Sequence, residues 1–331
     1  MRAAAFFDML SEKQHRVTHL ALPGCVLGTA GWTKLANLLV SPASNIHNLD
    51  ISKTCLHDRS IAIISNALIK NNTLRTLRLH WHYRNHPLTK NGWRIFSGVI
   101  SHPMCTLEDL HLGGNDLCDK SAAHLGDALA VNRTVTRLDL SCQRTITLQG
   151  WWKFSKCLRS ATCVLEKLYL DEWSITDDMA AVIVWSLKRN NCLKLLSVQE
   201  DFVTIKVWSV LAHILCDRST IDTCYSSNHT LTKLRVSSHY HWFGRDSNIL
   251  WSSLPYLKIN KLADKAVVAR KKIMLRHFSG ERTSEIHGFT CMDETILPFA
   301  LEWIGRNNDG YSLMFNVVRG LPSLFGTTCI I

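Results

Sequence analysis

Apolar residues recur along this chain in a spacing that neither a helix nor a simple strand explains. In the segment LEDLHLGGNDL, leucines lie at Leu107, Leu110, Leu112 and Leu117, and Asn115 precedes the last of them. A helix would repeat its apolar residues every three or four positions, and a plain strand would alternate throughout. The same L-x-x-L-x-L core starts at nine places: Val17, Ile46, Leu74, Leu107, Val135, Leu165, Leu193, Leu231 and Leu254.

Each copy of this core predicts one strand followed by one helix. Alternation along the strand directs Leu110 and Leu112 to one side and Asp109, His111 and Gly113 to the other. An apolar or small pair at helical spacing follows the first seven cores: Leu38/Leu39, Ala67/Leu68, Val99/Ile100, Ala128/Leu129, Cys157/Leu158, Ser186/Leu187 and Ile214/Leu215. Ordering one unit costs at least ~1 kcal/mol per residue, more than its few inward side chains regain, so neighbouring units must stack.

This pattern resembles the leucine-rich repeat, and the alternating repeat lengths resemble its ribonuclease-inhibitor-like branch. The resemblance implies an α/β solenoid shaped like a horseshoe, with a parallel sheet on the concave face and helices outside. In that family an asparagine or cysteine turns the chain out of each strand, and Asn115 and Cys25 fit this position. Other residues occupy it elsewhere: Thr54, Gln143, Trp173, Asp201 and His239.

The chain divides into three predicted parts. Residues 1–16 predict an N-terminal capping helix, residues 17–260 a solenoid of about nine repeats, and residues 261–331 a helical C-terminal cap. The segment KLADKAVVARKKIMLRHF predicts a basic helix, with Leu262, Ala266, Ala269 and Ile273 on one stripe. A second stripe beside it carries Lys261, Lys265, Lys272 and Arg276. Insertions interrupt repeats three and seven, at HWHYRNHPL and DRSTIDTCYSSNHT, and we expect them to form loops.

The chain carries no motif that indicates catalysis or a cofactor. A phosphate-cradling glycine loop, H-E-x-x-H and G-x-S-x-G are all absent. Carboxylates that point outward from the strands, such as Asp109 and Asp139, come from different repeats and have Arg78, Arg137 and Lys167 as neighbours. We therefore expect ordinary surface ion pairs, no cofactor and no enzymatic activity.

Histidines are the best candidates for a metal site. His80 and His82 could share one side of a strand, with His86 close by, and His239 and His241 lie in a matching location. A third ligand at a recognisable spacing is missing. Aromatic neighbours, Trp81, Tyr83, Tyr240 and Trp242, favour recognition of a partner instead.

Twelve cysteines are scattered through the chain without a C-x-x-C pair. Several occupy positions that want a small apolar group, so we expect reduced thiols and a cytoplasmic location, with the nucleus as an alternative. Three N-x-T triplets, at Asn71, Asn132 and Asn228, resemble glycosylation sites. Each lies just before a predicted strand, where asparagine suits a helix end, so we interpret them as structural. No apolar run approaches the ~18 residues that a membrane span needs.

Charge points to the kind of partner. The formal net charge is +11, and basic residues are concentrated around the predicted C-terminal helix. The resemblance to the leucine-rich repeat family implies a non-enzymatic module that binds an unknown protein through the concave face and rim loops, and the charge favours a partner with an acidic surface. A nucleic acid or another anionic surface is the alternative partner, and a regulator of small GTPases, as in some relatives of the family, is a lesser variant. The candidate binding residues are Arg78, Asp109, His111, Arg137, Asp139, Lys167, Tyr169, Lys233, Arg235, Trp242 and Lys258.

Overall fold

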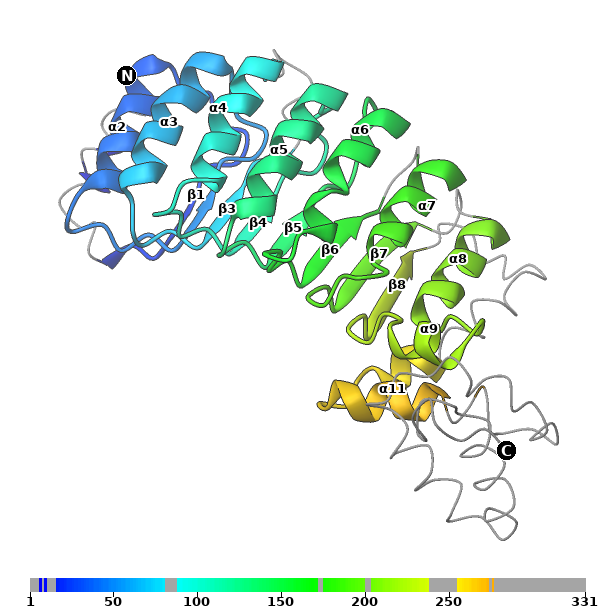
Figure 1. Cartoon of the computed structure of the whole chain (residues 1–331). Helices are drawn as coiled ribbons and strands as arrows, with labels where there is room; N and C mark the ends of the chain where they lie inside the picture. The colour runs from blue at the N-terminus through cyan, green and yellow to red at the C-terminus, as the bar shows by residue number, and fades with distance from the viewer. Residues whose placement is uncertain are drawn as a thin grey trace, which may run out of the picture.

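The computed structural model describes residues 6–7, 9–10, 16–80, 88–171, 175–199, 204–237, 255–273 and 276. Within these residues, strands and helices alternate into a curved solenoid, with the strands along the inner side and the helices along the outer side (Figure 1). The strands are β1 (His19–Ala21), β2 (Asn48–Asp50), β3 (Thr76–Arg78), β4 (Asp109–His111), β5 (Arg137–Asp139), β6 (Lys167–Leu170), β7 (Leu195–Gln199) and β8 (Lys233–Ser237). The helices are α2 (Thr29–Val40), α3 (Asp58–Lys70), α4 (Lys90–Ile100), α5 (Asp119–Val131), α6 (Leu148–Phe154), η2 (Cys157–Arg159), α7 (Asp177–Ser186), α8 (Ile205–Leu215), α9 (Ile221–Tyr225) and α11 (Lys265–Ile273).

The strands form one parallel sheet in the order of the sequence, β1 to β8. Its register aligns the central leucine of the first eight predicted cores: Leu20, Leu49, Leu77, Leu110, Leu138, Leu168, Leu196 and Leu234. These leucines are buried, except that Leu234 is partly buried. The leucine-rich repeat solenoid expected from the sequence is therefore the fold of the described residues.

The ninth predicted strand is wrong. Residues 255–259 form a helical turn instead, and Tyr256 and Leu257 are buried within it. Pro255 explains the difference, because proline cannot donate a ladder hydrogen bond but suits the first turn of a helix. The apolar spacing of LPYLKI alone does not distinguish the two structures.

Both residues of every predicted helix pair are buried. The side chains that successive helices bury alternate between large and small. In α4 and α6, Trp93 packs edge to face on Phe96, and Trp151 does so on Phe154. In α3 and α5 the matching positions hold Ile61 with Ile64 and Ala122 with Leu125, all buried. Large and small buried faces therefore interleave where successive helices pack together.

Neighbouring helices are also tied at their N-termini. The carboxylate of Asp58, at the start of α3, accepts hydrogen bonds from the backbone nitrogen (2.9 Å) and the hydroxyl (2.5 Å) of Thr89, which caps α4. The arrangement recurs between Asp119 and Thr147 and between Asp177 and Thr204. Each pair satisfies an exposed helix end and joins two repeats at once.

A ladder of buried asparagines joins the repeats at the other helix ends. The side-chain nitrogen of Asn132, after α5, donates a 2.7 Å hydrogen bond to the carbonyl of Ile100 in the preceding repeat. Three more asparagines make the same kind of bond at 2.7 Å: Asn71 to Leu39, Asn190 to Leu158 and Asn228 to Leu187. Asn260 donates at the same distance to the carbonyl of Leu231, which lies just before strand β8. Three of the five are the asparagines of the N-x-T triplets, whose buried amides serve the fold as expected.

The turns that leave the strands rely on several residue types. Asn115 donates to the carbonyls of Leu79 and Leu112, and Gln143 donates to the same Leu112 carbonyl at 2.8 Å. Thr54 donates its hydroxyl to the carbonyl of Ile51 at 2.6 Å. Varied side chains thus hold the same turn, whereas Cys25 is exposed. Trp173, Asp201 and His239 lie outside the described residues.

The insertion in repeat seven folds rather than forming an open loop. It contains the short helix α9, whose capping box joins Thr220 and Thr223 and which buries Ile221 and Cys224. Helix α11 packs against α9 at the end of the solenoid (Figure 1). As predicted, Ala269 and Ile273 of α11 are buried, but Lys272 is buried too. Its amine donates hydrogen bonds to the carbonyls of Leu215 (2.6 Å) and Asn228 (2.7 Å).

The N-terminal part is described only in pieces. Residues 6–7 and 9–10 are helical, and Phe7 is buried against the core. Ten cysteines lie within the described residues, and all ten have free thiols. Among the described helices, none has both the length and the hydropathy needed to cross a bilayer.

Candidate binding surface on the concave face

The outward side chains of the sheet form two parallel rows, because the register places one residue of each strand beside the next. The first row contains His19, Asn48, Thr76, Asp109, Arg137, Lys167, Leu195 and Lys233. The second row contains Ala21, Asp50, Arg78, His111, Asp139, Tyr169, Ser197 and Arg235. Nine of the eleven predicted binding residues lie in these two rows, so alternation along the strands placed them correctly.

A network of charges fills the middle of the face. The Nε2 atom of His111 lies 3.0 Å from Oδ1 of Asp109, and its Nδ1 atom lies 3.7 Å from Oδ2 of Asp139. The Nε atom of Arg137 lies 3.5 Å from the same Asp109 oxygen. Of the expected ion pairs between repeats, the structure shows Arg137 with Asp109, and the network around it centres on His111, which was not expected to take part.

Burial and the neighbouring charges shift the titration of this network. Burial works to lower the pKa of His111, but the carboxylates of Asp109 and Asp139 outweigh it, and the pKa is raised. Burial works to raise the pKa of both carboxyls, but contact with His111 outweighs it, and both pKa values are lowered. Asp109 and Asp139 are therefore ionised at neutral pH.

An aromatic residue joins the network to the C-terminal half of the face. The guanidinium of Arg137 lies over the ring of Tyr169, 5.0 Å from its centroid, in a cation–π contact. One strand further, the hydroxyl of Ser197 donates to the carboxylate of Asp171 at 2.8 Å. Tyr169 is half-buried, so one part of its ring is held by Arg137 while another part faces solvent.

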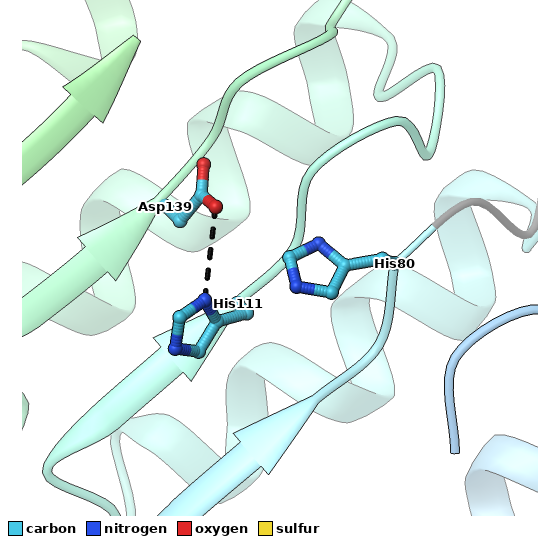
Figure 2. Close-up of side chains that lie close together, drawn as sticks. All are labelled: His80, His111 and Asp139. Atoms are coloured by element: carbon cyan, nitrogen blue, oxygen red, sulfur yellow. Dashed lines mark ion pairs between the residues drawn. The ribbon is translucent and has the colours of Figure 1, made fainter. Parts of the chain in front are cut away.

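His80 lies just past strand β3 and reaches toward the same network. Its ring packs edge to face on His111, with the centroids 5.2 Å apart, and Figure 2 shows both rings beside Asp139. Burial lowers the pKa of His80, so its imidazole is neutral at neutral pH. One nitrogen of each histidine and one oxygen of Asp139 lie within 4.8 Å of one another.

The C-terminal half of the face is basic and open. Lys167, Lys233 and Arg235 are exposed on β6 and β8. The prediction that Lys258 lies on an adjacent strand is wrong, because the Pro255 turn makes that segment helical; Lys258 is exposed on the turn. Trp242 lies outside the described residues, as do His82, His86, His239 and His241.

Sequence reasoning did not find the grouping of His80 with His111 and Asp139. It sought further ligands near His80 along the chain, whereas the structure supplies them from the next two repeats. The signal was present in the repeat register, which fixes which outward positions become neighbours.

Comparison with known proteins points to one group of relatives, although no protein-family model matches the chain. NACHT, LRR and PYD domains-containing protein 14 of Mus musculus is 29% identical over 170 residues, which cover 49% of this chain and 17% of the relative. Protein 9 of Bos taurus is 27% identical over 237 residues, covering 70% and 22%, and protein 5 of Homo sapiens is 24% identical over 206 residues, covering 62% and 17%. The chain is thus similar to proteins whose names join leucine-rich repeats with NACHT and PYD domains, and it spans about a fifth of their length.

Proposed function

We propose that this chain is a non-enzymatic module that binds a protein partner through its concave face and rim loops. We further propose that it corresponds to the leucine-rich repeat part of its relatives, in the ribonuclease-inhibitor-like branch. The partner presents an acidic surface to the basic C-terminal half of the face. The free thiols of the described cysteines support a cytoplasmic or nuclear location.

The observation that carries this proposal is the alignment of outward side chains into two continuous rows. A rigid parallel sheet holds them in fixed register, so a partner meets a surface that needs little ordering on binding. Arg137 and Tyr169 supply residue types that dominate binding energy at interfaces. The exposed charges of Lys167, Lys233 and Arg235 would mainly speed encounter and select acidic partners.

Nucleic acid is a weaker candidate because part of the basic helix serves the fold. Lys272 of α11 is buried and holds carbonyls of the last repeats. The helix therefore presents fewer charges to a phosphate backbone than its sequence indicates, and aromatic residues that could stack on bases do not interrupt it.

The test is a binding measurement with a purified partner. Partners captured by the tagged chain from cell extract would be identified by mass spectrometry, and one would then be purified. Lys233→Glu with Arg235→Glu should weaken its binding on the order of tenfold, mostly through slower association, and should reduce the dependence on salt. The matched control is Lys70→Glu with Lys120→Glu, which makes the same charge change at exposed positions of α3 and α5.

Two results would oppose the proposal. One is an unchanged affinity in the concave variant together with a loss in the outer-helix control. The other comes from titration with short random DNA duplexes. Tight, sequence-independent binding with a steep salt dependence would indicate a nucleic-acid binder instead.

A further inference from the structure

We propose that His80, His111 and Asp139 bind a divalent transition-metal ion, Zn²⁺ above all, at the centre of the concave face. Each residue offers one ligand atom, and the three atoms lie within 4.8 Å of one another. Figure 2 shows the three side chains converging from consecutive repeats. Imidazole nitrogen and carboxylate oxygen are ordinary Zn²⁺ ligands, at roughly 2.0 to 2.2 Å from the ion. Ligand atoms this close together could be brought to a single ion by small rotations of their side chains.

The surroundings of His111 favour this role. Its Nε2 atom faces Asp109 at 3.0 Å, which leaves Nδ1 directed toward Asp139 at 3.7 Å. A carboxylate on the far nitrogen of a ligand histidine is the usual arrangement in metal sites, where it orients the ring and raises its basicity. Arg137 in turn holds Asp109. Asp109 is therefore a positioning residue and not a ligand.

The atoms that hold the His111 ring from behind are buried. Oδ1 of Asp109, Nε2 of His111 and Nε of Arg137 lie close together as ion pairs, at 3.0 Å and 3.5 Å, without well-aligned hydrogen bonds. None of the three is a proposed ligand atom, so this group would position the His111 ring without contacting the ion.

The space for the ion depends on Gly113, the outward residue that follows β4. A Cβ atom at this position would lie 3.2 Å from Nδ1 of His80 and 3.7 Å from Oδ1 of Asp139. Any side chain here would crowd the gap between the two. Glycine leaves that gap open because it has no side chain.

Charges of both signs surround the site. Asp139 and Asp50 act on His80 as negative charges, and His111 and Arg78 act on it as positive charges. A proton on His111 would leave as the ion binds, so uptake of metal should release protons. His80 and Asp139 are partly exposed, which leaves the fourth position to water.

Cobalt titration of the full, reduced chain tests this proposal. Co²⁺ replaces Zn²⁺ and reports its ligands by absorption. We expect one equivalent with a tetrahedral nitrogen and oxygen spectrum, displaced by Zn²⁺. His80→Ala and Asp139→Asn should each lower the affinity by more than 100-fold, and Asp109→Asn should lower it by about 10- to 100-fold. The control is His124→Ala, a histidine on helix α5 outside the face.

Each other outcome overturns the proposal. Binding of equal affinity in His80→Ala and wild type would mean that the ion sits elsewhere. A thiolate-to-cobalt charge-transfer band would assign the ion to cysteines. Absence of any binding at micromolar Co²⁺ would leave the cluster as an ordinary ion network. Circular dichroism of every variant confirms that it is folded, and His80, which is only partly buried, is the substitution least expected to disturb the core.

Discussion

Asn132 and Ile100 belong to different repeats, and the side chain of Asn132 caps the C-terminal end of helix α4, which ends at Ile100. The Asn132 amide donates to the Ile100 carbonyl at 2.7 Å, while its oxygen accepts from the backbone nitrogens of Thr134 (2.9 Å) and Val135 (2.7 Å). Asn132→Ala removes the partner of two buried groups and of one partly buried group, so the free energy of unfolding should fall by about 2 to 4 kcal/mol in urea denaturation.

Asn66→Ala is the matched control for that measurement. Asn66 is exposed on α3, where alanine is the better helix former, so this variant should lose no stability. Equal losses in the two variants would show that the asparagine ladder contributes nothing specific. The same ladder gives the asparagines of the three N-x-T triplets a structural role, because each amide is buried and hydrogen-bonded in the folded protein.

Two glycines of α4 should respond to alanine in opposite directions. A Cβ at Gly92 would lie 2.3 Å from Oδ1 of Asp58, the oxygen that holds Thr89. Gly92→Ala should therefore break the link between α3 and α4 and destabilise the protein by about 1 to 3 kcal/mol. A Cβ at Gly98 meets nothing within 4 Å, so Gly98→Ala should raise stability by up to about 1 kcal/mol. Thermal melting of both variants checks this, and a loss in both would argue against the Asp58 contact.

Stability should rise with pH above neutral because Lys272 is buried. Burial lowers the pKa of this lysine from 10.5 to about 7. Between those values the unfolded state binds more protons than the folded state, so the free energy of unfolding increases as pH rises. From pH 7 to pH 9 the contribution of Lys272 is about 2 kcal/mol. Urea denaturation at several pH values should show this slope in wild type.

Lys272→Met isolates the effect, because the variant should have a shallower slope over the same range. The hydrogen bond with Cys224 lowers the pKa of Cys216 to about 7, and the charge of Lys272 adds to that shift. Both proteins should therefore carry Cys216→Ala, so that the difference in slope reports Lys272. Parallel pH profiles for the two proteins would mean that the amine stays charged in the folded state.

Thiol reactivity should follow burial. Cys118 is exposed at the N-cap of α5, where burial works to raise its pKa but hydrogen bonds from Ser121 and the backbone outweigh it and lower the pKa. Iodoacetamide should modify Cys118 quickly in the native protein. Cys157 is buried, which raises its pKa well above the usual value, so it should react only after unfolding. Mass spectrometry of timed samples measures both rates, and native disulfides would contradict the expected reduced state.

The fold could be predicted from the sequence because one physical constraint repeats. Inward leucines at fixed spacing, such as Leu110 and Leu138, fix strand, face and register together. The prediction failed where a single residue overrides the spacing. Pro255 favours a helix in the ninth core, although its apolar pattern matches the other eight. Lys272 is buried because its amine donates hydrogen bonds to carbonyls of the solenoid, and the sequence of the helix alone does not show those partners.

The outward position of each residue of the candidate site could be predicted from the sequence, but the grouping of these residues could not. Alternation showed that His111 and Asp139 face outward, but their approach to His80 depends on how successive strands are aligned. The gap left by Gly113 also depends on that alignment. The spacing of residues along the sequence does not fix the distances between side chains of different repeats, so only the structure shows this grouping.

Photo-crosslinking from two positions tests most directly whether the concave face binds the partner. A photoreactive amino acid would replace Tyr169 on the concave side in one variant and Trp152, exposed on the outer helix α6, in another. With the purified partner bound, we predict a covalent product from position 169 and none from position 152. A product from position 152 alone would place the interface on the outer helices and contradict the account.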